Sequence, residues 1–251
     1  MTEDKKELAD TLLMQGNVCM IRKQPEDALA KFTQSLYLNE KASTFTNRGA
    51  AHYQLKNYES AVKDHSKALE MDPENQVALK RRVQAYIGWQ KWTQALTDLA
   101  IVLDRNPEDA EAREQLRECE AEINQLQKRL DKRQTAEDLK KQGNEFITKD
   151  PQRAKQLYLE SVQQHPLKET YSNLSHVCLL LDEYEEAERH AIAALKLDPA
   201  FMKAWYRKGM ALLKREKAQD AITCFKKVLE KSPDDQLIQK HLSEAQALWE
   251  K

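Results

Sequence analysis

The sequence predicts an all-α protein made of repeated pairs of helices. Three observations point to this fold class: only 5 of the 251 residues are glycine, alanine recurs at intervals of 33 or 34 residues, and a proline follows most of these alanines at a fixed distance. A chain so poor in glycine lacks the turn residues that β-sandwiches and glycine-rich phosphate-binding loops require. We therefore expect helices joined by short turns along the chain.

Six alanines mark the repeat, and each lies in an amphipathic stretch. They are Ala28, Ala61, Ala95, Ala154, Ala187 and Ala221. A proline twelve residues later ends the second helix of each pair, because proline has no N–H and its ring clashes with the preceding turn. These positions hold Pro73, Pro107, Pro166, Pro199 and Pro233, with Glu40 in the first copy. Twelve residues before the alanine stand Gly16, Gly49 and Gly209, with Gly143 one residue closer and Val83 and Ser175 in the other copies.

This pattern resembles the tetratricopeptide repeat, a helix-turn-helix unit of about 34 residues with small residues where its helices cross. The resemblance covers residues 9 to 233 and implies six repeats. Their expected ranges are 9–41, 42–75, 76–109, 136–167, 168–201 and 202–235.

The six repeats form two sets of three, because a shift of 126 residues carries each marker alanine and Pro73 and Pro107 onto their counterparts. We predict two superhelical modules, residues 1–118 (module one) and 136–251 (module two), joined by a helical linker at 119–135. The polar stretch 109–144 is expected to form one long helix whose first turns cap module one, and residues 235–251 cap module two. Whether the linker helix continues unbroken into Leu139 is left open.

Composition argues against several partner classes. The chain has 40 basic and 41 acidic side chains and a net charge of −1, so no overall field attracts nucleic acid or a membrane surface. The N-terminal MTEDKKELAD lacks an apolar signal core, and no apolar run approaches the ~20 residues of a membrane span. We expect a cytoplasmic protein that binds neither nucleic acid nor membrane.

Nothing in the sequence favours catalysis or a metal. The four cysteines, Cys19, Cys119, Cys178 and Cys224, are far apart and form no C-x-x-C pair, so we expect reduced, mostly buried thiols. No nucleophile motif, H-E-x-x-H motif or glycine-rich loop accompanies the histidines. His65 stands four residues after Ala61, at a core-facing place of the repeat. We expect no enzyme, no metal and no cofactor.

The first helices of three stacked repeats line a concave groove suited to an extended peptide. In module two these helices carry three cations and two amides, which together make an anion site. The residues are Lys140, Asn144, Asn173, Lys203 and Arg207. A carboxy-terminal acidic residue would present two carboxylates to such a groove, one from its side chain and one from the chain end.

The motifs K-x-x-G-N, Y-S-N and K-x-x-x-R in consecutive repeats resemble the carboxylate clamp of Hop-type tetratricopeptide co-chaperones. The resemblance implies an adaptor whose module two holds the C-terminal Glu-Glu-Val-Asp tail of a heat-shock chaperone of the 70 or 90 kDa family. His176 follows Asn173 on the same helix and is a candidate groove contact.

Module one departs from the clamp pattern. Its corresponding residues are Leu13, Asn17, Asn47, Val77 and Arg81, so both lysines are replaced by apolar side chains. Either this groove accepts a less acidic peptide with an apolar anchor, or its asparagines and arginine only hold neighbouring helices. A non-clamp peptide or a client surface is favoured over a second chaperone tail as its partner. Four basic residues, Arg48, Lys80, Arg81 and Arg82, are expected to keep the groove locally basic.

The competing hypothesis is a scaffold that binds internal segments of other proteins and assembles a complex without a chaperone. The sequence does not determine which chaperone is preferred, what module one binds, or what the oligomeric state is. It also leaves open whether the chain is a fragment of a longer protein.

Overall fold

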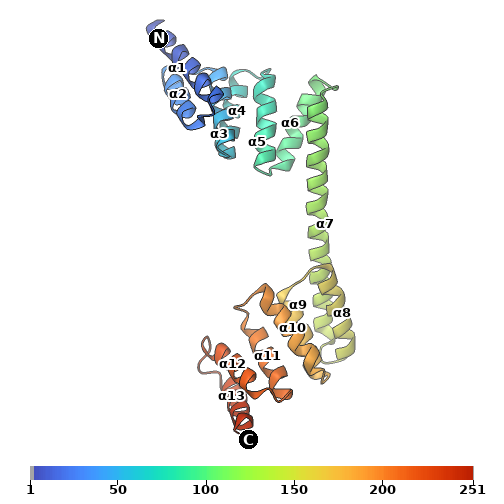
Figure 1. The fold of residues 1–251 in the computed structure, drawn as a ribbon. Helices are drawn as coiled ribbons and strands as arrows, with labels where there is room; N and C mark the ends of the chain where they lie inside the picture. The colour runs from blue at the N-terminus through green and yellow to red at the C-terminus, as the bar shows by residue number, and fades with distance from the viewer. Residues whose placement is uncertain (1–2, 251) are drawn as a thin grey trace. The chain divides into compact units, whose positions relative to one another are not determined.

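The computed structural model describes residues 3–250, so the first two residues of predicted module one and the last residue of module two lie outside it. Within this range the chain forms 13 helices and no strand, which confirms the all-α prediction (Figure 1). The chain divides into two compact units, Met1–Gln127 and Lys128–Lys251. None of the helices in residues 3–250 is long and apolar enough to cross a membrane.

The first unit is a series of helix pairs that follow the predicted repeats. The pairs are α1 (Glu3–Ile21) with α2 (Pro25–Leu38), α3 (Ala42–Gln54) with α4 (Tyr58–Met71), and α5 (Gln76–Gly88) with α6 (Trp92–Arg105). The beginning of α7 (Ala110–Phe146) covers the third pair, where Ala112 and Cys119 join the core around Leu99. The cap therefore contributes to this core one residue beyond the predicted boundary at 118.

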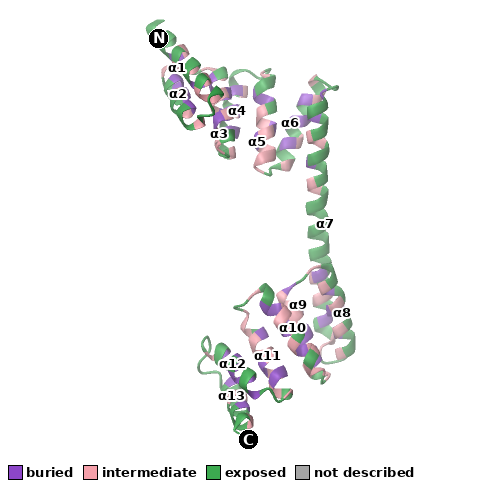
Figure 2. Cartoon of the chain, in the orientation of Figure 1, coloured by how far each residue is buried: buried purple, intermediate pink, exposed green. Residues whose placement is uncertain are grey.

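The second unit repeats the arrangement. The last turns of α7 face α8 (Pro151–Gln164), and α9 (Lys168–Leu180) with α10 (Tyr184–Leu197), α11 (Met202–Lys214) with α12 (Ala218–Leu229), and the capping helix α13 (Gln236–Trp249) follow. The helix α7 is unbroken from Ala110 to Phe146, which answers the question that the sequence left open at Leu139. Its residues 124–135 are all exposed, whereas its two ends carry buried positions (Figure 2).

Glycine is rare because five of the turns within helix pairs use other residues in the left-handed conformation. These are Lys23, Lys56, Gln90, Asp182 and Glu216, with φ between 57° and 59°. In the second pair the N–H of Asn57 donates to the carbonyl of His52 at 2.9 Å, which closes the helix end. Each such residue costs about 1 kcal/mol or more of backbone strain, which the packing of the pair offsets.

Four of the five glycines lie instead where the two helices of a pair cross. A Cβ on Gly209 would lie 2.7 Å from the ring of Phe225, and one on Gly143 would lie 2.6 Å from Tyr158. His65 packs under Gly49 in the same way and is fully buried, which confirms its predicted core position. Three of the four cysteines are also buried, and all four are free thiols.

Candidate functional site

The five predicted clamp residues of module two come from three helices of the second unit. Lys140 and Asn144 lie near the end of α7, Asn173 lies on α9, and Lys203 and Arg207 lie on α11. A spacing of four residues places the two residues of each pair on one side of their helix. Side chains of the three helices are joined by hydrogen bonds.

Three of these side chains are joined by hydrogen bonds into a ladder across the helices. Asn173 Nδ2 donates to Asn144 Oδ1 at 2.9 Å, and Arg207 Nη1 donates to Asn173 Oδ1 at 3.2 Å. The hydroxyl of Tyr158 donates to Asn144 Oδ1 at 2.7 Å, and Arg207 also donates to Ser172 Oγ at 2.6 Å. Because Asn144 uses its oxygen within the ladder, its amide N–H groups are left to donate to a ligand.

Sequence reasoning missed Tyr158 and Ser172 as supports of this ladder. Ser172 stands inside the Y-S-N motif, next to Asn173, so the motif contained the signal. Tyr158 occupies the core position opposite Gly143, where two other copies have phenylalanine, and its hydroxyl was the signal. Burial raises the pKa of Tyr158 to about 12, so this hydroxyl remains protonated and donates.

Arg207 is a largely desolvated cation. Burial lowers its pKa to about 10, so it is still charged at neutral pH, and none of the carboxylates in residues 3–250 pairs with it. His176 lies nearby, and burial followed by the charge of Arg207 lowers the pKa of its imidazole. His176 is therefore neutral at pH 7, and the groove carries an arginine whose charge an anion would compensate.

The two clamp lysines are not equivalent. Lys140 forms an ion pair with Glu137 one turn earlier on α7, and both side chains are partly buried. Lys203 is exposed and, within the described part of the chain, has no ion-pair partner. Glu137 was not among the predicted site residues, although its spacing of three residues from Lys140 on a helix is enough to predict the contact. A ligand carboxylate at Lys140 would share that ammonium with Glu137.

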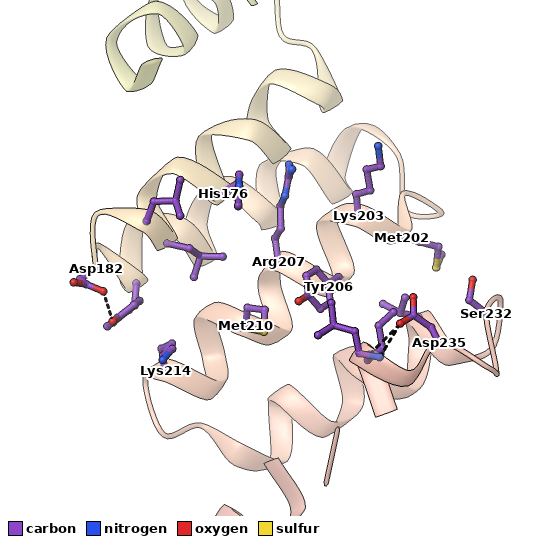
Figure 3. A pocket seen from close by; sticks show the side chains of 16 residues that line it. His176, Asp182, Met202, Lys203, Tyr206, Arg207, Met210, Lys214, Ser232 and Asp235 are labelled. Carbon is purple, nitrogen blue, oxygen red and sulfur yellow. Dashed lines mark hydrogen bonds between the residues drawn. The ribbon is translucent and has the colours of Figure 1, made fainter. Parts of the chain in front are cut away.

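A cavity of about 750 Å³ opens beside Lys203 and Arg207 (Figure 3). His176 lines it, at the place where a groove contact was predicted, and helices α9, α11 and α13 supply apolar walls that include Leu179, Met210 and Ile238. The apolar walls were not predicted, because α13 was assigned only a capping role. The site thus combines a cationic end with a roomy apolar pocket.

Module one has the same ladder without the lysines. Asn47 Nδ2 donates to Asn17 Oδ1 at 2.9 Å, and Arg81 Nη1 donates to Asn47 Oδ1 at 3.2 Å. At the lysine positions Leu13 is half-buried and Val77 is 55% exposed. The polar ladder is therefore shared by both modules, whereas the residues at the lysine positions differ.

The expectation of a locally basic groove in module one is wrong. Three of its four cations are paired with acidic side chains of neighbouring segments: Arg48 with Asp64, Arg82 with Asp98, and Lys80 with Asp109, just before α7. Both arginine pairs are bidentate, with distances of 2.6 to 2.8 Å. Arg81 is the remaining cation of the four.

Side chains that could hold a metal do not gather in the described residues, where no group of three or more His, Cys, Asp or Glu has suitable geometry. What the grooves offer is hydrogen-bond donors and positive charge. Groups of this kind can bind an anion.

Two segments match family models described as the tetratricopeptide repeat, residues 42–75 and residues 181–236. The first is the second predicted repeat, and the second covers the end of the fifth repeat and the whole of the sixth. Yeast Tom70 has a similar fold, with a TM-score of 0.50 and 18% sequence identity over 98% of this chain and 69% of that chain.

Two relatives illustrate the range of similar proteins. Sperm-associated antigen 1 of Rattus norvegicus is 35% identical over 124 residues, which are 49% of this chain and 14% of that protein. Hsp70-Hsp90 organizing protein 2 of Arabidopsis thaliana is 26% identical over 238 residues, which are 88% of this chain and 41% of that protein. The matched part is thus less than half the length of either relative.

Proposed function

Because this chain is a tetratricopeptide-repeat protein, we propose that it is a cytoplasmic co-chaperone adaptor whose module two binds the acidic C-terminal tail of a heat-shock protein 70 or 90 family chaperone. The observation that carries the proposal is the Asn144–Asn173–Arg207 ladder beside the unpaired Lys203. The likeness to a protein named Hsp70-Hsp90 organizing protein 2 supports the same class of partner.

The donors match the two carboxylates of a terminal aspartate. Arg207 and Lys203, four residues apart on α11, face one carboxylate, and Asn144 with Lys140 faces the other. Each charge-assisted hydrogen bond contributes roughly 1.5 to 3 kcal/mol before ordering costs. A few such bonds support micromolar binding, about −8 kcal/mol. The groove is open to solvent, so the affinity falls as salt is added.

Isothermal titration calorimetry with a peptide ending in Met-Glu-Glu-Val-Asp tests this proposal. Amidation of the peptide's C-terminus and the Lys203→Met substitution should each weaken binding by about ten- to a hundredfold, because each removes a charge-assisted hydrogen bond. Glu137→Gln should strengthen binding, because it frees the ammonium of Lys140 from an internal competitor.

The matched control is Lys208→Met, on the same helix as Lys203 but with its ammonium over the ring of Trp205. This variant should bind the peptide as the wild type does. Equal affinity for the acid and amidated peptides, together with no effect of Lys203→Met, would contradict the proposal and favour the scaffold that binds internal segments.

Module one is proposed to hold a second protein, such as a client, in its own groove. Leu13 and Val77 support a partner that is less acidic than a chaperone tail, because neither can bind a carboxylate. The adaptor would then bind two different proteins, one in each module.

A further inference from the structure

The grooves of the two modules differ in a reciprocal way. Where module two has Leu179, Leu180 and Met210, a shift of 126 residues gives Tyr53, Gln54 and Gln84 in module one. Where module two has its two clamp lysines, module one has leucine and valine. Module two therefore has a charged end and an apolar pocket, and module one has an apolar end and a polar pocket.

The polar pocket of module one has a volume of about 270 Å³. It is lined by Ala50, Tyr53, Gln54, His65, Arg81 and Gln84. Its side chains come from α3, α4 and α5, so it lies among the helices that carry the ladder. The pocket can hold one small polar group of a ligand.

Arg81 is the charge at this pocket. Burial lowers its pKa, which means that desolvation disfavours its cationic form. Its hydrogen bonds run to neutral oxygens, those of Thr46 at 3.3 Å and Asn47 at 3.2 Å, and no carboxylate of the described residues pairs with it. A carboxylate from a ligand would supply the missing partner.

His65 adds a second unsatisfied group to the pocket. It is fully buried, and neither ring nitrogen has a hydrogen-bond partner. Burial, followed by the charges of Arg81, Arg82 and His52, lowers the pKa of His65 to about 3, so the ring is neutral and keeps one N–H donor at pH 7. The amides of Gln54 and Gln84 lie around the same space, and Nε2 of Gln84 donates to Oε1 of Glu111 at 3.3 Å.

We propose that the groove of module one binds a peptide with a single carboxylate beside an apolar side chain. The carboxylate pairs with Arg81 and accepts hydrogen bonds from His65 and Gln54, and the apolar side chain packs against Val77 and Leu13. This inference does not depend on the function proposed for module two, because none of its residues lies in that module.

Nuclear magnetic resonance of the ¹⁵N-labelled full chain tests the inference, since the signals report each module separately. Three short peptides are the probes: an acetylated, amidated peptide with Leu-Glu-Leu, the same peptide with Leu-Gln-Leu, and an acetylated peptide without acidic side chains that ends in a free leucine carboxylate. The Leu-Glu-Leu peptide should bind about tenfold more tightly than its glutamine analogue and shift the side-chain amides of Gln54 and Gln84. The third peptide distinguishes a terminal carboxylate from a side-chain carboxylate as the source.

Two variants separate binding from folding. Arg81→Met should abolish the preference for glutamate, whereas Arg113→Met, at an arginine that pairs with Glu108 on the surface, should leave it intact. Val77→Lys changes an exposed side chain and should give the groove a preference like that of module two. A peptide with two adjacent acidic residues should bind this variant at least about tenfold more tightly than it binds the wild type. The inference is overturned by equal binding of the glutamate and glutamine peptides, by shifts confined to module two, or by no gain in Val77→Lys.

Discussion

Single side chains decide how the helices of each pair cross. Glycine stands opposite a ring in four copies, as with Gly209 and Phe225, whereas the third copy combines Val83 with Leu99. The ring of His65 takes this place in the second copy, where it is buried and neutral. A histidine here fills the same space as phenylalanine but makes the stability of the first unit depend on pH.

The pH dependence of unfolding should therefore change when His65 is replaced by phenylalanine. The pKa of His65 is about 3 when folded and about 6.5 when unfolded, so between these values the unfolded chain binds more protons and stability falls as the pH falls. From pH 6.5 to pH 5 the wild type should lose about 2 kcal/mol more than His65→Phe. Urea unfolding of both proteins at the two pH values measures this difference, and equal losses would show that His65 is not held neutral.

At the scale of the helix, close crossing outweighs helix propensity. Glycine in a helix interior is usually about 1 kcal/mol less favourable than alanine. In α11, however, a Cβ on Gly209 would lie 2.7 Å from the ring of Phe225, which is fully buried. The pair α11–α12 therefore needs glycine as long as its partner is aromatic.

Gly209→Ala should destabilise the second unit by roughly 1 to 3 kcal/mol, the usual cost of overpacking. Phe225→Leu should cost less in the Gly209→Ala background than in the wild type, because the smaller side chain relieves the clash, as Leu99 does opposite Val83. A double-mutant cycle from thermal unfolding measures this coupling. Additive effects would mean that the ring moves aside without cost.

At the scale of the whole molecule, the two compact units each have their own core. They share the helix α7, whose residues 124–135 are all exposed and so add no common core. Stability should then be a property of each unit and not of the chain as one cooperative structure.

Calorimetry should accordingly resolve two unfolding transitions, and Gly209→Ala should lower the temperature of only one of them. The other transition serves as the internal control. A single transition that shifts as a whole would show that α7 couples the two units.

The repeat period, the ends of the second helices of most repeats and the helices that carry the groove residues could all be predicted from the sequence. Each depends on local rules: proline ends a helix, glycine permits a close crossing, and residues four apart share a face. The ladder positions Asn144, Asn173 and Arg207 follow from these rules together with the period. Their hydrogen bonds confirm that the three side chains meet.

Which charges are available to a ligand could not be predicted in this way. Arg82 and Asp98 are sixteen residues apart and Lys80 and Asp109 twenty-nine, and these pairs exist only because packing brings their helices together. The amino-acid sequence alone determines the helices and their crossings. The low glycine count and the recurring alanines and prolines act locally and at a fixed period. Tertiary packing decides that Arg81 keeps its charge uncompensated, because electrostatic pairing depends on neighbours in space.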